Sequence, residues 1–130
     1  MHAERIGKWT AVALILIVGG IHLVEAPDQF NDATYKGLLF LANATGALIA
    51  AAAIGGGLRW GRPLGVLVAG GATVAYVVSR TVGLPGLPVD PAWFEPAGVL
   101  SLVGEGLFIV LALKLPRWQS TTVSERARAA

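Results

Sequence analysis

Cysteine is absent from the 130 residues of this sequence, and methionine occurs once. Without cysteine the chain has no disulfides, no thiol redox motif and no thiolate metal site, and a single methionine argues against a copper(I) site. Charged residues are also scarce, at 14%, where soluble domains carry about 25%. Because hydrophobic residues reach 55%, the chain is neither a water-soluble globule nor a disordered segment. The class that remains is a small polytopic membrane protein.

Four apolar stretches are each long enough to cross a bilayer, which takes roughly 20 residues. They cover residues 9–26, 37–58, 64–82 and 97–115. Helices are expected because every backbone polar group needs a partner within lipid. Short connections favour antiparallel neighbours. The sequence therefore predicts an all-α, four-helix transmembrane bundle running up-down-up-down, as a single domain over residues 1–118 with a polar tail over residues 119–130.

Basic residues are divided unevenly between the two expected membrane faces. Only Lys36 and Arg80 fall on one face, and the other face holds Arg5, Lys8, Arg59, Arg62, Lys114, Arg117, Arg126 and Arg128. Since cytoplasmic loops are rich in Lys and Arg, we expect a plasma-membrane protein with both termini and the tail in the cytoplasm. The formal charge of +2 is then a signal of orientation. It indicates the lipid bilayer as a partner and gives no reason to expect nucleic acid.

Small residues recur at steps of four and form ridges on two of the stretches. The ridge residues are Gly46 and Ala50 on the second stretch and Gly61, Gly65, Ala69 and Thr73 on the third. Such ridges let membrane helices approach closely. Two interpretations stay open: the ridges pack the bundle internally, or they mediate a homo-oligomer or docking onto a larger membrane complex.

Glu105 lies about nine residues into the last stretch, roughly 13 Å along a helix axis, which places a carboxyl group near the middle of the membrane. Such a group costs a few kcal/mol on insertion scales and is often functional. Glu105 is therefore either a functional acid or a structural hydrogen-bond partner of a neighbouring helix.

His22 and Glu25 form an H-x-x-E pair near the outer end of the first stretch. A separation of three residues places both on one helical face. They are candidate ligands for a divalent metal, or a relay for a proton, since histidine exchanges protons near neutral pH. The alternative is an interfacial histidine bonded to a nearby acid and water. Pro27 is expected to end this helix.

Arg80 stands near the end of the third stretch, in the segment SRTVGLP, where Gly83 and Pro85 predict a helix stop. Arginine in a last turn complements the helix dipole. We also expect a salt bridge from Arg80 to Glu25, Asp90 or Glu95 that would fasten the outer connection to the bundle.

The polar residues of all four stretches suggest one cavity that opens outward and reaches down to Glu105. Its predicted ligand-binding residues are His22, Glu25, Asn43, Tyr76, Arg80, Ser101 and Glu105. No nucleophile elbow, phosphate loop or HExxH motif is present, so an enzyme is disfavoured. The leading hypothesis is a membrane-embedded binding module for a cation, proton or small polar ligand. The alternatives are a non-catalytic accessory or assembly subunit, and an oligomeric proton-coupled transporter that uses Glu105.

The chain resembles a family of uncharacterised small four-span membrane proteins of high-GC Gram-positive bacteria. The resemblance rests on His22-Leu23-x-x-x-Pro27, on the segment from Ser79 to Pro85, and on an acid in the last stretch, here Glu105. It implies a four-helix membrane fold and the importance of these positions, without an activity.

Overall fold

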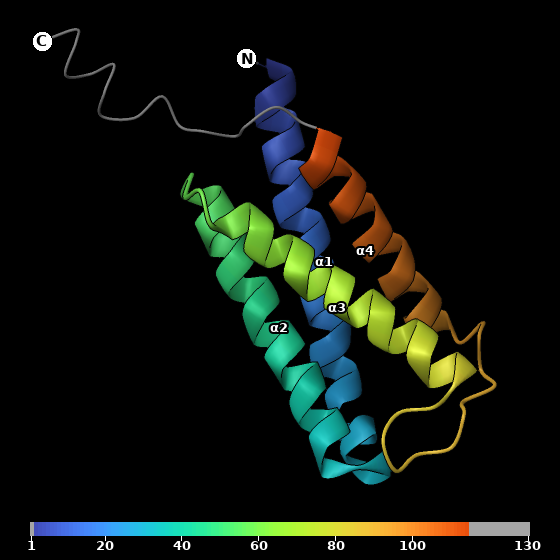
Figure 1. The fold of residues 1–130 in the computed structure, drawn as a ribbon. Helices are drawn as coiled ribbons and strands as arrows, with labels where there is room; N and C mark the ends of the chain where they lie inside the picture. The colour runs from blue at the N-terminus through green and yellow to red at the C-terminus, as the bar shows by residue number, and fades with distance from the viewer. Residues whose placement is uncertain (1, 115–130) are drawn as a thin grey trace, which may run out of the picture.

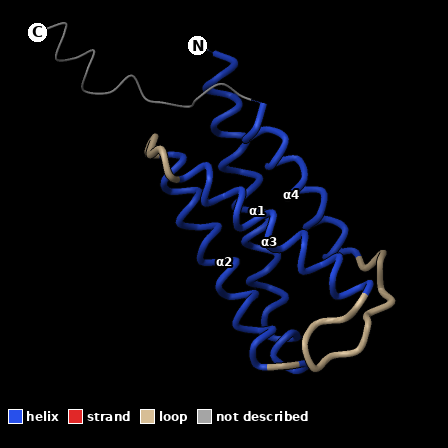
Figure 2. The backbone as a smooth tube through the Cα atoms, viewed as in Figure 1, coloured by secondary structure: helices blue, strands red, loops and turns tan. Residues whose placement is uncertain are grey.

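The computed structural model describes residues 2–114, and these residues form four helices (Figure 1). They are α1 (His2–Asp32), α2 (Thr34–Gly55), α3 (Gly61–Thr81) and α4 (Pro96–Lys114). All four are long and apolar enough to cross a membrane, and no strand occurs within the described range (Figure 2). The prediction of an all-α bundle with four membrane-spanning helices is confirmed. The tail predicted over residues 119–130 lies outside the described residues.

Successive helices run in opposite directions, so both ends of the bundle are easily defined (Figure 1). The N-terminus, the α2–α3 connection and the end of α4 lie at one end, called here the N-terminal end. The α1–α2 and α3–α4 connections lie at the other, called here the loop end. In cross-section the helices form a ring in chain order, with α1 packed on α2 and α4, and α3 packed on α2 and α4.

Pro27 lies inside α1, which continues to Asp32, so the expectation that it ends the helix is wrong. A proline removes one backbone hydrogen bond, and membrane helices tolerate it where neighbouring groups satisfy the freed carbonyl. The chain reverses instead at Ala33, whose extended backbone (φ −164°, ψ 141°) separates α1 from α2. The α1–α2 connection is therefore one residue long rather than the expected segment over residues 27–36.

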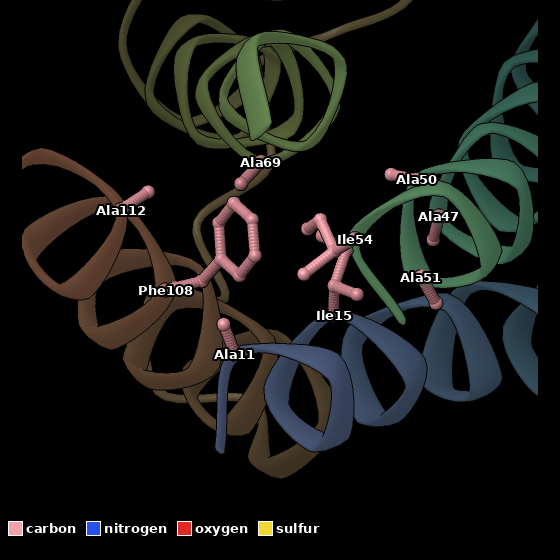
Figure 3. Close-up of a cluster of buried hydrophobic side chains, with 9 residues drawn as sticks. All are labelled: Ala11, Ile15, Ala47, Ala50, Ala51, Ile54, Ala69, Phe108 and Ala112. Carbon is pink, nitrogen blue, oxygen red and sulfur yellow. The ribbon is translucent and has the colours of Figure 1, made fainter. Parts of the chain in front are cut away.

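The N-terminal half of the bundle is filled by a cluster of buried apolar side chains (Figure 3). The cluster is built mainly of alanine, with Phe108, Ile15 and Ile54 as its large members. Figure 3 shows the Phe108 ring between Ala69 of α3 and Ala11 of α1. Because alanine side chains are small, the helices approach closely here and leave no room for polar groups.

The small-residue ridges face inward and are used in packing within the chain. A Cβ atom at Gly61 would lie 2.7 Å from the backbone nitrogen of Ile54, and one at Gly65 would lie 2.4 Å from Cζ of Phe108. A Cβ at Gly46 would lie 2.8 Å from a methyl group of Val68. Of the two interpretations of the ridges, intramolecular packing is the one that these contacts bear out.

Replacing Gly61 by alanine is expected to destabilise the bundle by about 1–3 kcal/mol, because the added methyl group must push the α2 backbone away. The matched control is Gly70→Ala on the same helix, where an added Cβ meets nothing within 4 Å. Its effect on stability is expected to be neutral or favourable. Unfolding of both variants in detergent micelles measures the difference, and equal stability would contradict the close approach of α2 and α3.

Candidate functional site

A cavity of about 340 Å³ occupies the half of the bundle nearer the loop end. All four helices and the α3–α4 connection line it. Each of the residues singled out from the sequence lies on its wall: His22, Glu25, Asn43, Tyr76, Arg80, Ser101 and Glu105. The apolar cluster of Figure 3 fills the bundle beyond the inner end of the cavity.

Glu105 forms the inner end of the cavity and is 2% exposed. Ser101, one turn earlier on α4, donates a hydrogen bond to its Oε1 at 2.7 Å. The hydroxyl of Thr73 on α3 lies 2.8 Å from its Oε2. Both carboxyl oxygens therefore have hydroxyl partners, which offsets part of the cost of burying this group within the membrane.

Thr73 has a single hydroxyl hydrogen and two oxygens within reach. Its Oγ1 is 2.8 Å from Oε2 of Glu105 and 2.9 Å from the carbonyl oxygen of Ala69. When Thr73 donates to Glu105, the carboxylate needs no proton of its own. Oε1 of the carboxylate, which accepts from Ser101, is likewise an acceptor without a hydrogen.

From the sequence, Thr73 is expected only to pack, as a member of the small-residue ridge of the third stretch. Its role at Glu105 follows from that same ridge, because a hydroxyl one turn beyond Ala69 must face the interior. The position of Thr73 on the ridge was the feature of the sequence that could have indicated this contact.

His22 is held in one orientation by its own helix. Its Nδ1 lies 2.9 Å from the carbonyl oxygen of Val18, which can only accept, so Nδ1 carries the hydrogen. The ring packs against Phe40 of α2 at a centroid distance of 4.9 Å. In the neutral imidazole, Nε2 is then a hydrogen-bond acceptor.

Nε2 of His22 lies 4.0 Å from Oε1 of Glu105. This separation is too long for a direct hydrogen bond. The distance shows that α1 and α4 turn their polar side chains toward a shared space. With His22 neutral, two acceptors face each other across it, with no donor between them among the described residues.

Glu25 lines the same cavity one turn closer to the loop end and is half-buried. Among residues 2–114, no group of three or more His, Asp or Glu side chains is arranged to hold a metal ion. The H-x-x-E pair therefore has no third His, Asp or Glu beside it, among the described residues, to complete a metal site.

Asn43 connects α2 to α3. Its amide nitrogen donates to the carbonyl oxygen of Val68 at 3.1 Å. The amide oxygen is buried and has no hydrogen-bond partner in the described part of the chain. Asn43, a residue of the cavity wall, therefore has one unpaired hydrogen-bond acceptor.

Arg80 fastens the α3–α4 connection to the end of α3. Its side chain is 9% exposed, and its guanidinium lies 3.3 Å from a carboxylate oxygen of Asp90 and 3.5 Å from one of Glu95. It also donates to the carbonyl oxygen of Ala92 at 3.2 Å and to the hydroxyl of Ser79 at 2.8 Å. Of the three acids expected from the sequence, Asp90 and Glu95 are the partners at these distances.

Tyr76, one turn before Arg80 on α3, also holds the α3–α4 connection. Its ring lies beneath the guanidinium of Arg80, 3.9 Å from the central carbon, and its hydroxyl donates to the carbonyl oxygen of Trp93 at 2.5 Å. Gly98 on α4 makes room for the ring, since a Cβ there would lie 2.7 Å from it. A larger residue at this position would displace Tyr76 from the cavity wall.

Backbone interactions also hold the α3–α4 connection at this end of the cavity. Gly83 has a positive φ of 85°, which turns the chain after α3 as the Gly83 and Pro85 pattern predicted. The backbone nitrogen of Asp90 then donates to the carbonyl oxygen of Ser79 at 2.9 Å. Tyr35 at the start of α2 donates to the carbonyl oxygen of Pro85 at 2.6 Å, so the connection is bonded to both sides of the bundle.

The cavity wall carries more acidic than basic groups. Its bases are Lys36 and Arg80, and its acids are Glu25, Asp32, Asp90, Glu95 and Glu105. Lys36 is paired with Asp32 at 2.5 Å, and Arg80 is shared by two acids. The carboxyl groups of Glu25 and Glu105 have no basic Lys or Arg partner among these pairs.

Comparisons of the chain with protein-family models, with curated proteins and with solved structures find no match. The chemistry of the cavity itself is therefore the basis for a function.

Removing the guanidinium with Arg80→Gln is expected to destabilise the loop end by about 1–3 kcal/mol, because several charge-assisted hydrogen bonds are lost together. Arg80→Lys is expected to recover only part of this, since lysine lacks the planar fork. The matched control is Lys36→Gln, whose i,i+4 pair with the exposed Asp32 contributes about 0.5 kcal/mol or less. Hydrogen exchange of residues 83–95 measures the effect, and unchanged exchange in Arg80→Gln would contradict the fastening role.

Proposed function

We propose that this protein is an integral membrane binding module that receives a small cationic or polar solute into the cavity. The observation that carries the proposal is the pair of acceptors at the inner end, Nε2 of His22 and Oε1 of Glu105, which face each other 4.0 Å apart. The surplus of acids on the wall favours a cation. A concave space with a few convergent polar groups and apolar walls is the common form of a small-molecule site.

The proposal includes an orientation in which the cavity opens away from the cytoplasm. The basic side chains of Arg5, Lys8, Arg59, Arg62 and Lys114 belong to the N-terminal end, whereas the cavity lies toward the loop end. The positive-inside rule then assigns the N-terminal end to the cytoplasm of a plasma membrane. We also propose, on the sequence motifs alone, kinship with the small four-span proteins of high-GC Gram-positive bacteria.

The alternative functions have less support. A proton-coupled transporter needs a passage to the opposite side, and the apolar cluster around Phe108 and Ile15 fills that half of the bundle. An accessory subunit needs a docking surface, and the small-residue ridges are used within the chain. Binding from one side needs only the cavity that is present.

The cavity can be tested by thiol labelling, because the natural chain has no cysteine. Ala75 lines the cavity, and its neighbour Val74 is 63% exposed on the outer face of the bundle. With a trimethylammonium methanethiosulfonate reagent, Ala75→Cys is expected to react about tenfold faster than Val74→Cys, since a thiolate forms readily only where water is present.

The same labelling experiment tests whether the cavity prefers cations. After normalisation to the rates with free cysteine, the cationic reagent is expected to label Ala75→Cys several-fold faster than an anionic sulfonate reagent, because an acidic cleft concentrates cations. Labelling of Ala75→Cys no faster than Val74→Cys would remove the proposed function.

Reporter fusions test the orientation. Green fluorescent protein fused after Ala130 is expected to fluoresce, and alkaline phosphatase inserted after Gly86 is expected to be active, since basic flanks stay in the cytoplasm. The control exchanges the two reporters. Active phosphatase at the C-terminus would show that the cavity opens toward the cytoplasm instead.

A further inference from the structure

We propose that the inner end of the cavity binds the ammonium group of a small primary amine, held between Nε2 of His22 and Oε1 of Glu105. This inference rests on the proposed function and specifies its ligand. It assigns the ligand a positive charge, N–H donors and a short apolar body.

The need for N–H donors follows from the hydrogen-bond inventory. Nδ1 of His22 donates to Val18, which leaves a lone pair on Nε2 of the neutral imidazole, and Oε1 of the Glu105 carboxylate accepts from Ser101. A single donor group placed beside both atoms can bond to each, because they are 4.0 Å apart. An ammonium group supplies several donors from one nitrogen.

The need for positive charge follows from the wall of the cavity. Arg80 and Lys36 are already paired with Asp90, Glu95 and Asp32. No described basic residue is paired with Glu105 other than the histidine 4.0 Å away. Charge-assisted hydrogen bonds to a carboxylate are among the strongest that a protein makes.

The need for an apolar body follows from the rest of the lining. Between the inner end and the loop end, the wall includes Ile21, Leu39, Phe40, Ala75 and Leu102. A bare ammonium ion would leave these walls uncovered, whereas a short alkyl chain buries its apolar surface against them. A metal ion fits less well, because no group of three His, Asp or Glu side chains converges in residues 2–114.

The decisive experiment compares three probes on the full chain carrying Ala75→Cys. Butylammonium, tetramethylammonium and 1-butanol have the same number of non-hydrogen atoms, but only butylammonium has both a positive charge and N–H donors. The readout is the concentration of each probe that halves the labelling rate with neutral methyl methanethiosulfonate. Butylammonium is expected to protect at a concentration about tenfold lower than either other probe.

Variants in the same Ala75→Cys background locate the site. Glu105→Gln is expected to raise the half-protecting concentration of butylammonium about tenfold, since it removes the carboxylate at the inner end. The matched control is Asp28→Asn, which removes the same charge from α1 outside the cavity and is expected to change protection by less than about twofold. His22→Phe keeps a ring against Phe40, removes Nε2, and is expected to act like Glu105→Gln.

The outcomes separate this inference from the proposed function. If Ala75→Cys is labelled but tetramethylammonium or butanol protects as well as butylammonium, the ammonium site is overturned and the cavity stands. Equal protection in Glu105→Gln and in the parent chain also overturns it. If Ala75→Cys resists labelling altogether, the proposed function fails as well. Should Glu105→Gln not fold, the three probes on the parent chain still decide.

Discussion

The carboxyl group of Glu105 is the constraint around which the loop-end half of the bundle is organised. A buried carboxyl group within a membrane must find hydrogen-bond partners inside the protein, because lipid offers none. Ser101 provides one from its own helix, and Thr73 provides the other from α3. His22 of α1 approaches to 4.0 Å. One side chain therefore links α3 to α4 by hydrogen bonds, and the polar faces of α1, α3 and α4 meet in a common space.

The remaining structure allows that space to exist. In the N-terminal half, alanine and glycine let the helices approach until Phe108 and Ile15 fill the interior. In the loop-end half, larger polar side chains stand between the helices, and a cavity of about 340 Å³ remains. At the loop end, Arg80 joins α3 to the α3–α4 connection. Tight packing at one end and a bonded connection at the other hold the cavity open between them.

The chemistry of the cavity is defined by what is already paired. The basic groups of its wall are neutralised by acids, and the hydrogen of His22 is used within α1. What stays available at the inner end is a set of acceptors, beside the apolar side chains that line part of the wall. Such an arrangement discriminates by demanding a donor, since a ligand without one leaves buried acceptors unpaired. This physical asymmetry is the basis for proposing a small cationic donor as the ligand.

The sequence by itself determined that the protein is of the membrane class, how many spans it has, and which polar residues lie within the apolar stretches. Span length, composition and charge bias are properties of the chain alone, and insertion into a bilayer depends directly on them. Only the tertiary structure decided that the ridge at Gly61 and Gly65 packs internally and that α1 continues through Pro27. It also decided that Thr73 is hydrogen-bonded to Glu105. These depend on how each helix is rotated and on which neighbour it meets, and such choices are made by side-chain packing between segments distant in sequence.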